Sequence, residues 1–295
     1  GISTVAYAGD LHGQVWSFAL NTGVTAYTAT PTSAGVKLFT AEDANGNVQP
    51  ITAGMLAGKD SATSNLWLFF GTGKYLSVAD LPNVATQTWY GIIVQSGTSG
   101  LVSNLSTGRS ALVKRAIVAE TAGDITTTPP ISPGRAITPA PSTPDMAGES
   151  GWYIDLLSPT GVGGADVQQG ERIVTPNQFQ GNQLIATTRI PKATDACNPT
   201  GAGWIMALNP FTGTAPVSNF FDINGDGSIN SGDTITVGGK TYTSSGIGFT
   251  ALPNNPIFVG STMLVSFDSG ATGSFATSGS GGSLQRVSWR ELITQ

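Results

Sequence analysis

Short runs of β-branched and aromatic residues, each closed by a tight turn, restrict this chain to a fold made of many short strands. The interval 5–23 shows the design: an apolar run, a turn at 10–13, a second apolar run and a closing Thr-Gly pair. The same order returns at 203–213 and, more loosely, at 263–273. Strand pairs that recur along a chain are typical of propeller blades. The sequence therefore predicts an all-β fold and favours a modified β-propeller.

Composition agrees with this fold class. Of the 295 residues, 39 are glycine and 17 are proline, and only 11% are charged, too few for the ion-paired faces of exposed helices. The interval 109–120 fits a short helix or a strand equally well. A blade takes about 40 to 50 residues, so we expect an incomplete propeller. Further strands are expected at 50–52, 65–71, 74–76, 88–95, 151–156, 172–174, 183–189 and 247–250.

Two intervals interrupt the strand pattern. Residues 121–150 are too rich in proline for a central strand and too polar for a core, so we expect an insertion loop or a mobile linker. Residues 270–283 are rich in glycine and serine and precede a closing apolar run at 284–292. The long insertions are expected to lie outside the blades.

Charge and hydropathy exclude several classes of protein. The net charge of −5, without a basic cluster, argues against nucleic-acid binding. No apolar run is long enough to span a bilayer, so we expect no transmembrane segment. The chain opens at Gly1 without an initiator methionine or a signal peptide, so we expect a processed product or a fragment. Low charge with much Ser, Thr, Asn and Gly favours an extracellular protein.

Oxygen ligands recur with regular spacing in the interval 222–233. They occupy positions one, three, five, seven, nine and twelve, and Gly227 at position six permits a sharp turn. This spacing predicts one bound Ca²⁺, with Asn230 contributing directly or through a water. The alternative is a solvated turn, which Asn, Asp and Gly also favour. The expected ligands are Asp222, Asn224, Asp226, the Ser228 carbonyl, Asn230 and Asp233.

The flanks of this calcium loop differ from those of an EF-hand. Residues 217–221 are too few and too apolar for an entering helix. Residues 234–242 read as a β-hairpin that turns at Gly238 and Gly239. We therefore expect the loop to lie among strands and to stabilise a structure or a surface.

No catalytic motif is found. The chain has no Gly-x-Ser-x-Gly elbow, no histidine pair for zinc and no phosphate-binding loop. His12, the one histidine, is expected to cap or pack a turn. Asp222 and Asp226 could form the carboxylate pair of a glycoside hydrolase, but calcium coordination explains their spacing within the loop better. We therefore expect no enzymatic activity.

Single residues that attract attention have structural explanations. The one cysteine, Cys197, is expected to be a buried thiol or to pair with a cysteine outside this chain. Four tryptophans in apolar strand patterns are expected to pack between blades and not to bind sugars. They are Trp16, Trp152, Trp204 and Trp289.

Six stretches, in this order, resemble the C-terminal domain of the PilY-type proteins, which are tip-associated components and adhesins of type IV pili. The resemblance implies a modified propeller related to the quinoproteins, with a calcium loop in a late blade. In that family position nine of the loop is Asp, whereas here it is Asn230, which leaves open whether Asn230 or Asp233 completes the coordination sphere. The stretches are 7–16, 70–76, 170–175, 197–204, 222–233 and 287–292.

The same resemblance implies roles in pilus biogenesis, twitching motility and surface adhesion, at the pilus tip or the bacterial cell surface. The implied partners are minor pilins or pilus tip subunits, a host or abiotic surface, and the absent N-terminal part of the protein. The alternatives are a quinoprotein-like propeller enzyme and an extracellular carbohydrate-binding module. Few cationic residues are present to bind the carboxylates of a quinone cofactor.

Overall fold

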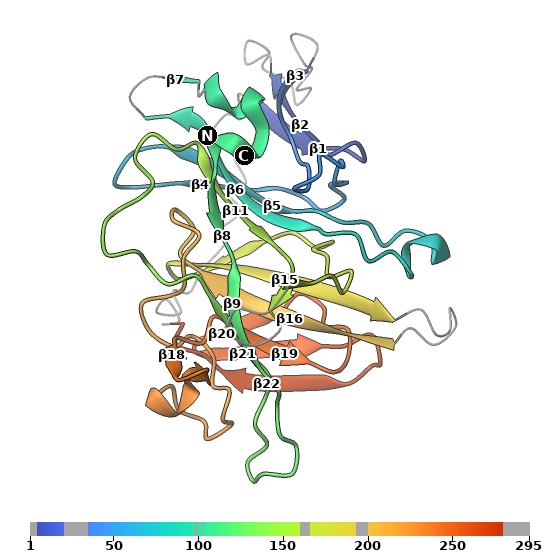
Figure 1. Cartoon of the computed structure of the whole chain (residues 1–295), viewed down its shortest axis with the longest axis vertical. Coiled ribbons are helices and arrows are strands. Elements are labelled where there is room, and N and C mark those ends of the chain that lie inside the picture. The colour runs from blue at the N-terminus through green and yellow to red at the C-terminus, as the bar shows by residue number, and fades with distance from the viewer. Residues whose placement is uncertain are drawn as a thin grey trace, which may run out of the picture.

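The computed structural model describes residues 5–20, 35–97, 100–101, 103–159, 166–192 and 200–279. Within these ranges the chain forms 22 β-strands and three short 3-10 helices. The sheets follow one another along the long axis of the molecule, from the N-terminal sheet to the C-terminal one (Figure 1). The predicted all-β fold is confirmed.

Two six-stranded sheets form the centre of the molecule. The first has the order β4 (Leu56–Lys59), β5 (Leu66–Gly71), β6 (Thr88–Ser96), β11 (Gly151–Asp155) and β8 (Val113–Arg115), and β7 (Gly100–Leu101) also pairs with β6. The second has the order β14 (Gln178–Gln180), β15 (Gln183–Lys192), β16 (Thr200–Leu208), β19 (Gly246–Phe249), β10 (Gly134–Ile137) and β9 (Ile117–Thr121).

Smaller sheets flank this centre. One contains β1 (Val5–Gly9), β2 (Gln14–Ala19) and β3 (Val36–Thr40), and another contains β20 (Ile257–Val259), β21 (Thr262–Ser266) and β22 (Thr272–Ala276). A short pair joins β12 (Ser158–Pro159) to β13 (Asp166–Val167). The described strands form separate open sheets, none of which closes into a ring, as expected for an incomplete propeller.

Aromatic side chains fill the space between the two central sheets. Trp89 of β6 and Trp152 of β11 are fully buried, and their ring centroids lie 5.7 Å apart in an edge-to-face arrangement. They share one hydrophobic cluster with Trp204 of β16. The predicted packing role of Trp152 and Trp204 is therefore confirmed.

The prediction of a loop over all of 121–150 is wrong in its middle. The stretch 134–137 forms β10, a fully buried strand paired with both β9 and β19. The buried guanidinium of Arg135 is neutralised by two glutamates, so a charged residue is tolerated inside the sheet. The interval 109–120, in contrast, resolves mainly into strands, β8 and β9, that follow the 3-10 helix Ser103–Ala111.

Three predicted strands, 50–52, 74–76 and 172–174, are also absent from the described sheets, and Ile51 makes only an isolated bridge, with Gly73. Arg172 makes only a single bridge, with Arg189. Its side chain donates to the carbonyl oxygens of Lys74 and Asp80, at 2.9 and 2.8 Å. An arginine side chain thus replaces strand pairing as the partner of these backbone groups. The predictions for Cys197, Trp289 and 284–292 lie outside the described residues.

Candidate metal centre

The predicted calcium loop lies among strands, as expected. It follows Phe221, which bridges Thr277, and ends in a single 3-10 turn, Ser231–Asp233. The predicted hairpin is then formed by β17 (Ile235–Val237) and β18 (Lys240–Tyr242). Its two turn residues, Gly238 and Gly239, have φ values of 57° and 76°, the left-handed backbone of a two-residue hairpin turn.

Asp222 is the buried end of the loop, with 5% of its surface exposed. Its Oδ1 accepts the Gly225 amide at 2.7 Å, and its Oδ2 accepts the Gly227 amide at 2.8 Å. Gly225 and Gly227 have φ values of 72° and 83°, so both turn positions need glycine. The first carboxylate therefore organises the turn.

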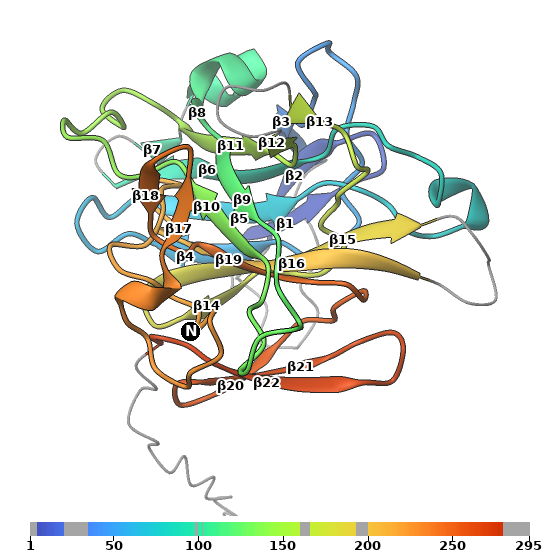
Figure 2. The same cartoon turned by 60° about the horizontal axis from the view of Figure 1, so that its bottom comes forward.

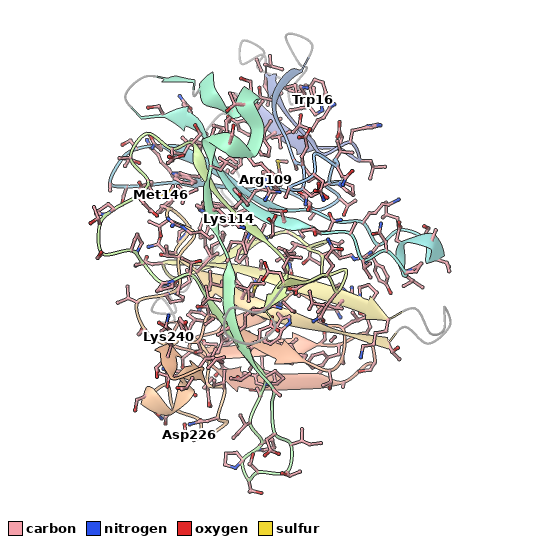
Figure 3. The ribbon with its side chains drawn as sticks, in the orientation of Figure 1. Trp16, Arg109, Lys114, Met146, Asp226 and Lys240 are labelled. Carbon is pink, nitrogen blue, oxygen red and sulfur yellow. The ribbon has the colours of Figure 1, made fainter. Side chains whose placement is uncertain are left out.

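Asp226, at the exposed end of the loop, accepts hydrogen bonds from the side chains at positions three and nine, Asn224 and Asn230. Its Oδ2 accepts from Nδ2 of Asn224 at 3.1 Å and from Nδ2 of Asn230 at 3.0 Å. Its Oδ1 accepts the Ser228 amide at 2.8 Å. Figure 3 shows Asp226 on the outer side of the molecule. Four of the six predicted positions thus converge directly, through side chains or the Ser228 backbone.

Asp233 has a different environment. It is fully buried, and its Oδ1 accepts the amides of Ile223 at 2.9 Å and Asn224 at 3.3 Å. Its Oδ2 accepts the amide of Asn230 at 2.9 Å. The carboxylate thus ties the end of the loop to its beginning, and its role as a metal ligand stays a prediction.

The loop carries negative charge without a basic partner. Burial raises the pKa of Asp222, against the hydrogen bonds from Gly227 and Gly225, and the charges of Asp233 and Asp226 raise it further. Hydrogen bonds from Asn230 and Ser228 lower the pKa of exposed Asp226. None of the ion pairs found within the described ranges includes a carboxylate of the loop.

The donor set is mixed. In the part of the chain that the structure describes, no three His, Cys, Asp or Glu side chains gather as a metal-binding group. Asp233 is directed at backbone amides, so an ion at Asp222 and Asp226 would need the amide oxygens and the Ser228 carbonyl as well. Neutral and charged oxygens together are an ordinary ligand set for Ca²⁺.

The loop rests on a protruding hairpin that spans 124–131 (Figures 1 and 2). The Ser132 amide donates to the Ile223 carbonyl at 2.7 Å. A Cβ atom at Gly225 would lie 2.9 Å from the Pro130 carbonyl oxygen. The sequence gives no local signal for this contact, because the two segments are about ninety residues apart.

His12, which was also considered as a catalytic residue, lies in an ordinary turn. His12 is exposed in the turn between β1 and β2, where its amide donates to Asp10 Oδ1 at 2.9 Å. Trp16 donates its indole N–H to Asp10 Oδ2, also at 2.9 Å. The Asp10 carboxylate therefore fixes this turn by accepting hydrogen bonds from His12 and Trp16.

A buried charge network was missed by the sequence analysis. Arg135 is fully buried, and its Nη1 lies 2.6 Å from Glu171 Oε1. Its Nε donates to Glu120 Oε1 at 2.8 Å, and its guanidinium lies 4.1 Å from the ring centroid of Trp204. The available signal was a single arginine between apolar residues at 134–137.

Comparisons with known proteins identify relatives of the chain. No protein-family model matches it. A type IV pilus biogenesis factor PilY1 homolog from Xylella fastidiosa is 38% identical over 297 residues, covering 99% of this chain and 21% of that protein. The type IV pilus biogenesis factor PilY1 of Pseudomonas aeruginosa is 27% identical over 256 residues, covering 78% of this chain and 21% of that protein.

The fold has a solved counterpart. The crystal structure of the Pseudomonas aeruginosa PilY1 C-terminal domain matches with a TM-score of 0.71 at 21% identity, covering 95% of this chain and 59% of that one. The chain spans about a fifth of the length of the curated relatives it matches. No helix among the described residues is both long and apolar enough to cross a membrane. Sequence identity over nearly the whole chain, together with the shared fold, shows that this chain belongs to the PilY-type proteins and has the fold of their C-terminal domain.

Proposed function

We propose that this chain is the calcium-binding domain of a type IV pilus biogenesis factor and has no catalytic role. The proposal rests on the relatives, which are named as type IV pilus biogenesis factors. It includes roles in twitching motility and surface adhesion, at the pilus tip or the cell surface. The proposed partners are minor pilins or pilus tip subunits and the surface to which the pilus attaches.

One observation carries the calcium proposal: the loop 222–233 holds three carboxylates, and no basic side chain in the described ranges pairs with them. Like charges at close range disfavour one another, and the raised pKa of Asp222 reflects burial together with that repulsion. A divalent cation removes the repulsion. A long loop that offers several oxygen ligands suits Ca²⁺ better than Mg²⁺, which requires a smaller octahedron.

The proposed ligands have distinct tasks. Asp222 and Asp226 supply charge, Asn224 and Asn230 supply amide oxygens, and Ser228 supplies its carbonyl. Asp226 must exchange the N–H donors of Asn224 and Asn230 for the ion, which is feasible because Asp226 is exposed. Asp233 closes the loop through its hydrogen bonds to backbone amides.

Bound calcium would stabilise a binding surface and would take no part in catalysis. Gly225 of the loop lies beside Pro130 of the 124–131 hairpin, and Ser132, the residue that follows the hairpin, donates its amide to the Ile223 carbonyl. The tip of that hairpin exposes Ile125, of which 88% is accessible. An ion that stiffens the loop therefore also stiffens a protruding surface to which a pilus subunit could bind.

Thermal unfolding tests the proposal. Calcium at millimolar concentration should raise the midpoint of the wild-type chain, because a ligand that binds only the folded state stabilises it. Asp226→Ala should lose this response and keep the midpoint of the metal-free wild type. Magnesium at the same concentration is the control for charge screening. An equal response of both proteins to calcium would contradict the proposed site.

A further inference from the structure

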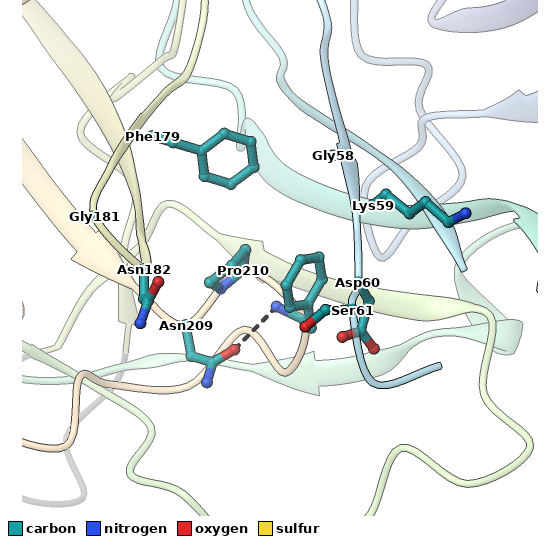
Figure 4. A pocket seen from close by; sticks show the side chains of 10 residues that line it. Gly58, Lys59, Asp60, Ser61, Phe179, Gly181, Asn182, Asn209 and Pro210 are labelled. Carbon is teal, nitrogen blue, oxygen red and sulfur yellow. Dashed lines mark hydrogen bonds between the residues drawn. The ribbon is translucent and has the colours of Figure 1, made fainter. Parts of the chain in front are cut away.

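A second candidate site is formed by residues outside the calcium loop. A cavity of about 430 Å³ opens between the turn after β4, the turn between β14 and β15, and the segment 209–211 that follows β16 (Figure 4). Strands β4 and β14 are the outer strands of the two central sheets. The volume lies within the range of about 300 to 1,000 Å³ that is usual for ligand sites.

Two aromatic rings form the apolar part of this cavity. Phe179 of β14 remains 38% exposed, and Phe211 lines the other side. Both pack on the fully buried Phe69, with ring centroids 5.7 and 6.3 Å from it. Phe179 lies against Gly58, where a Cβ atom would be 2.7 Å from its ring. Packing on Phe69 therefore fixes both rings, and Gly58 leaves room for Phe179 because it has no side chain.

Most polar side chains of the cavity have hydrogen-bonding groups that no described residue occupies. Lys59, Ser61 and Asn182 are exposed, and their side chains make no hydrogen bond or ion pair with any described residue. Asp60 accepts from the Ala62 amide at 3.0 Å and from Thr63 Oγ1 at 2.6 Å. A carboxylate has about four acceptor sites, so Asp60 retains capacity for a ligand.

The charges of the lining disfavour two classes of ligand, anions and metal ions. Lys59 and Asp60 are adjacent and of opposite sign, and no other charged residue lines the cavity. An anion such as a phosphate would meet Asp60, and a metal ion would meet Lys59. A neutral ligand that has one apolar face and several hydroxyl groups fits this arrangement.

We propose that this cavity binds a neutral, hexose-containing glycan. The C–H face of a pyranose ring would lie on Phe179, since an aromatic ring offers a flat apolar surface. Its hydroxyls both donate and accept, so they match the amide of Asn182, the carboxylate of Asp60 and the hydroxyl of Ser61. This site shares no residue with the calcium loop, so it goes beyond the function proposed above.

Titration of the whole chain with neutral oligosaccharides of glucose, galactose and mannose, followed by NMR chemical shifts, tests the proposal. Asn182→Ala and Asp60→Asn should each weaken binding by about tenfold, the effect of losing one hydrogen bond to a neutral ligand. Asn45→Ala, in an exposed turn elsewhere, is the matched control and should bind like the wild type. Asp226→Ala should also bind glycan normally, which separates this result from the calcium test.

Three outcomes would overturn the proposal: no binding of any neutral oligosaccharide at millimolar concentration, binding by Asn182→Ala and Asp60→Asn that equals the binding by the wild type, or binding of charged glycans or peptides in its place. Circular dichroism of each variant guards against loss of fold. Asn182 lies in an exposed two-residue turn, so its replacement should leave the thermal midpoint unchanged.

Discussion

Asp233 and Ile223, the twelfth and second residues of the loop, are joined by a hydrogen bond of 2.9 Å from the Ile223 amide to the Asp233 carboxylate. This bond closes the loop through the protein's own atoms. Ile223 in turn lies within the hydrophobic cluster that contains Phe220 and Phe221. The buried half of the loop is therefore fixed by the core, whereas Asp226 remains accessible to an ion.

The first prediction distinguishes the role of Asp233, which closes the loop, from the role of Asp226, which binds the ion. Asp233→Ala should lower the free energy of unfolding by about 2 to 3 kcal/mol without calcium, because it leaves the amides of Ile223, Asn224 and Asn230 without acceptors. Asp226→Ala, at an exposed position, should leave it close to the wild-type value. Urea denaturation in chelator measures both values. Equal stability of the two variants would show that Asp233 does not hold the loop.

The second prediction concerns the buried network of Arg135. Arg135→Met should lower the free energy of unfolding by about 3 to 5 kcal/mol, since it leaves Glu171 buried without a counter-charge. The double variant Arg135→Met, Glu171→Met should recover part of that loss. A double-mutant cycle in urea gives the coupling. A coupling free energy near zero would contradict a role for this pair in stabilising the second sheet.

The third prediction concerns acid stability. Burial raises the pKa of Asp80, but hydrogen bonds from Lys74 and from the Leu76 and Ser77 amides outweigh it and lower the pKa to about 2. Because the folded pKa lies below the unfolded one, Asp80 stabilises the fold above about pH 4, and this contribution is lost between about pH 4 and pH 2.

Asp80→Asn should remove that part of the pH dependence, about 1 to 2 kcal/mol in the free energy of unfolding. Urea denaturation at several pH values over this interval measures it. Other carboxylates also titrate there, so the difference between the two proteins is the informative quantity. Parallel pH profiles would show that Asp80 has an ordinary pKa in the folded state.

The fourth prediction links the loop to its neighbours. Calcium should slow amide hydrogen exchange in the 124–131 hairpin and in β17 and β18, because these segments contact or directly follow the loop. The hairpin of β1 and β2, in a different sheet, is the internal control and should exchange at the same rate with and without calcium. Protection confined to 222–233 would argue against coupling to the 124–131 hairpin.

Local patterns predicted the elements whose contacts are also local. The turn at 10–13, the hairpin at Gly238 and Gly239, and the absence of flanking helices around the loop follow from neighbouring residues. The position of β10 does not, because Arg135 is stabilised by Glu171, 36 residues away in sequence. Prolines on either side of 134–137 concealed a strand that only a distant carboxylate makes possible.

The same limit applies to the candidate site. Ligand spacing predicted which residues lie on the loop, but not that Asp233 accepts backbone amides. Its partners include Ile223, whose side chain is fixed by packing on distant strands. Nor could the spacing indicate that Pro130 supports Gly225, since that contact arises from the pairing of β9 with β10.

Isothermal titration calorimetry with calcium on the wild type and on Asp226→Ala is the most direct test of the calcium site. We expect the wild type to bind one ion per chain, with a dissociation constant of about 10⁻⁴ to 10⁻³ M, as in extracellular calcium modules. Asp226→Ala should give no measurable heat of binding while its circular dichroism spectrum stays that of the wild type. Identical binding curves, or no binding by the wild type, would contradict the site at 222–233.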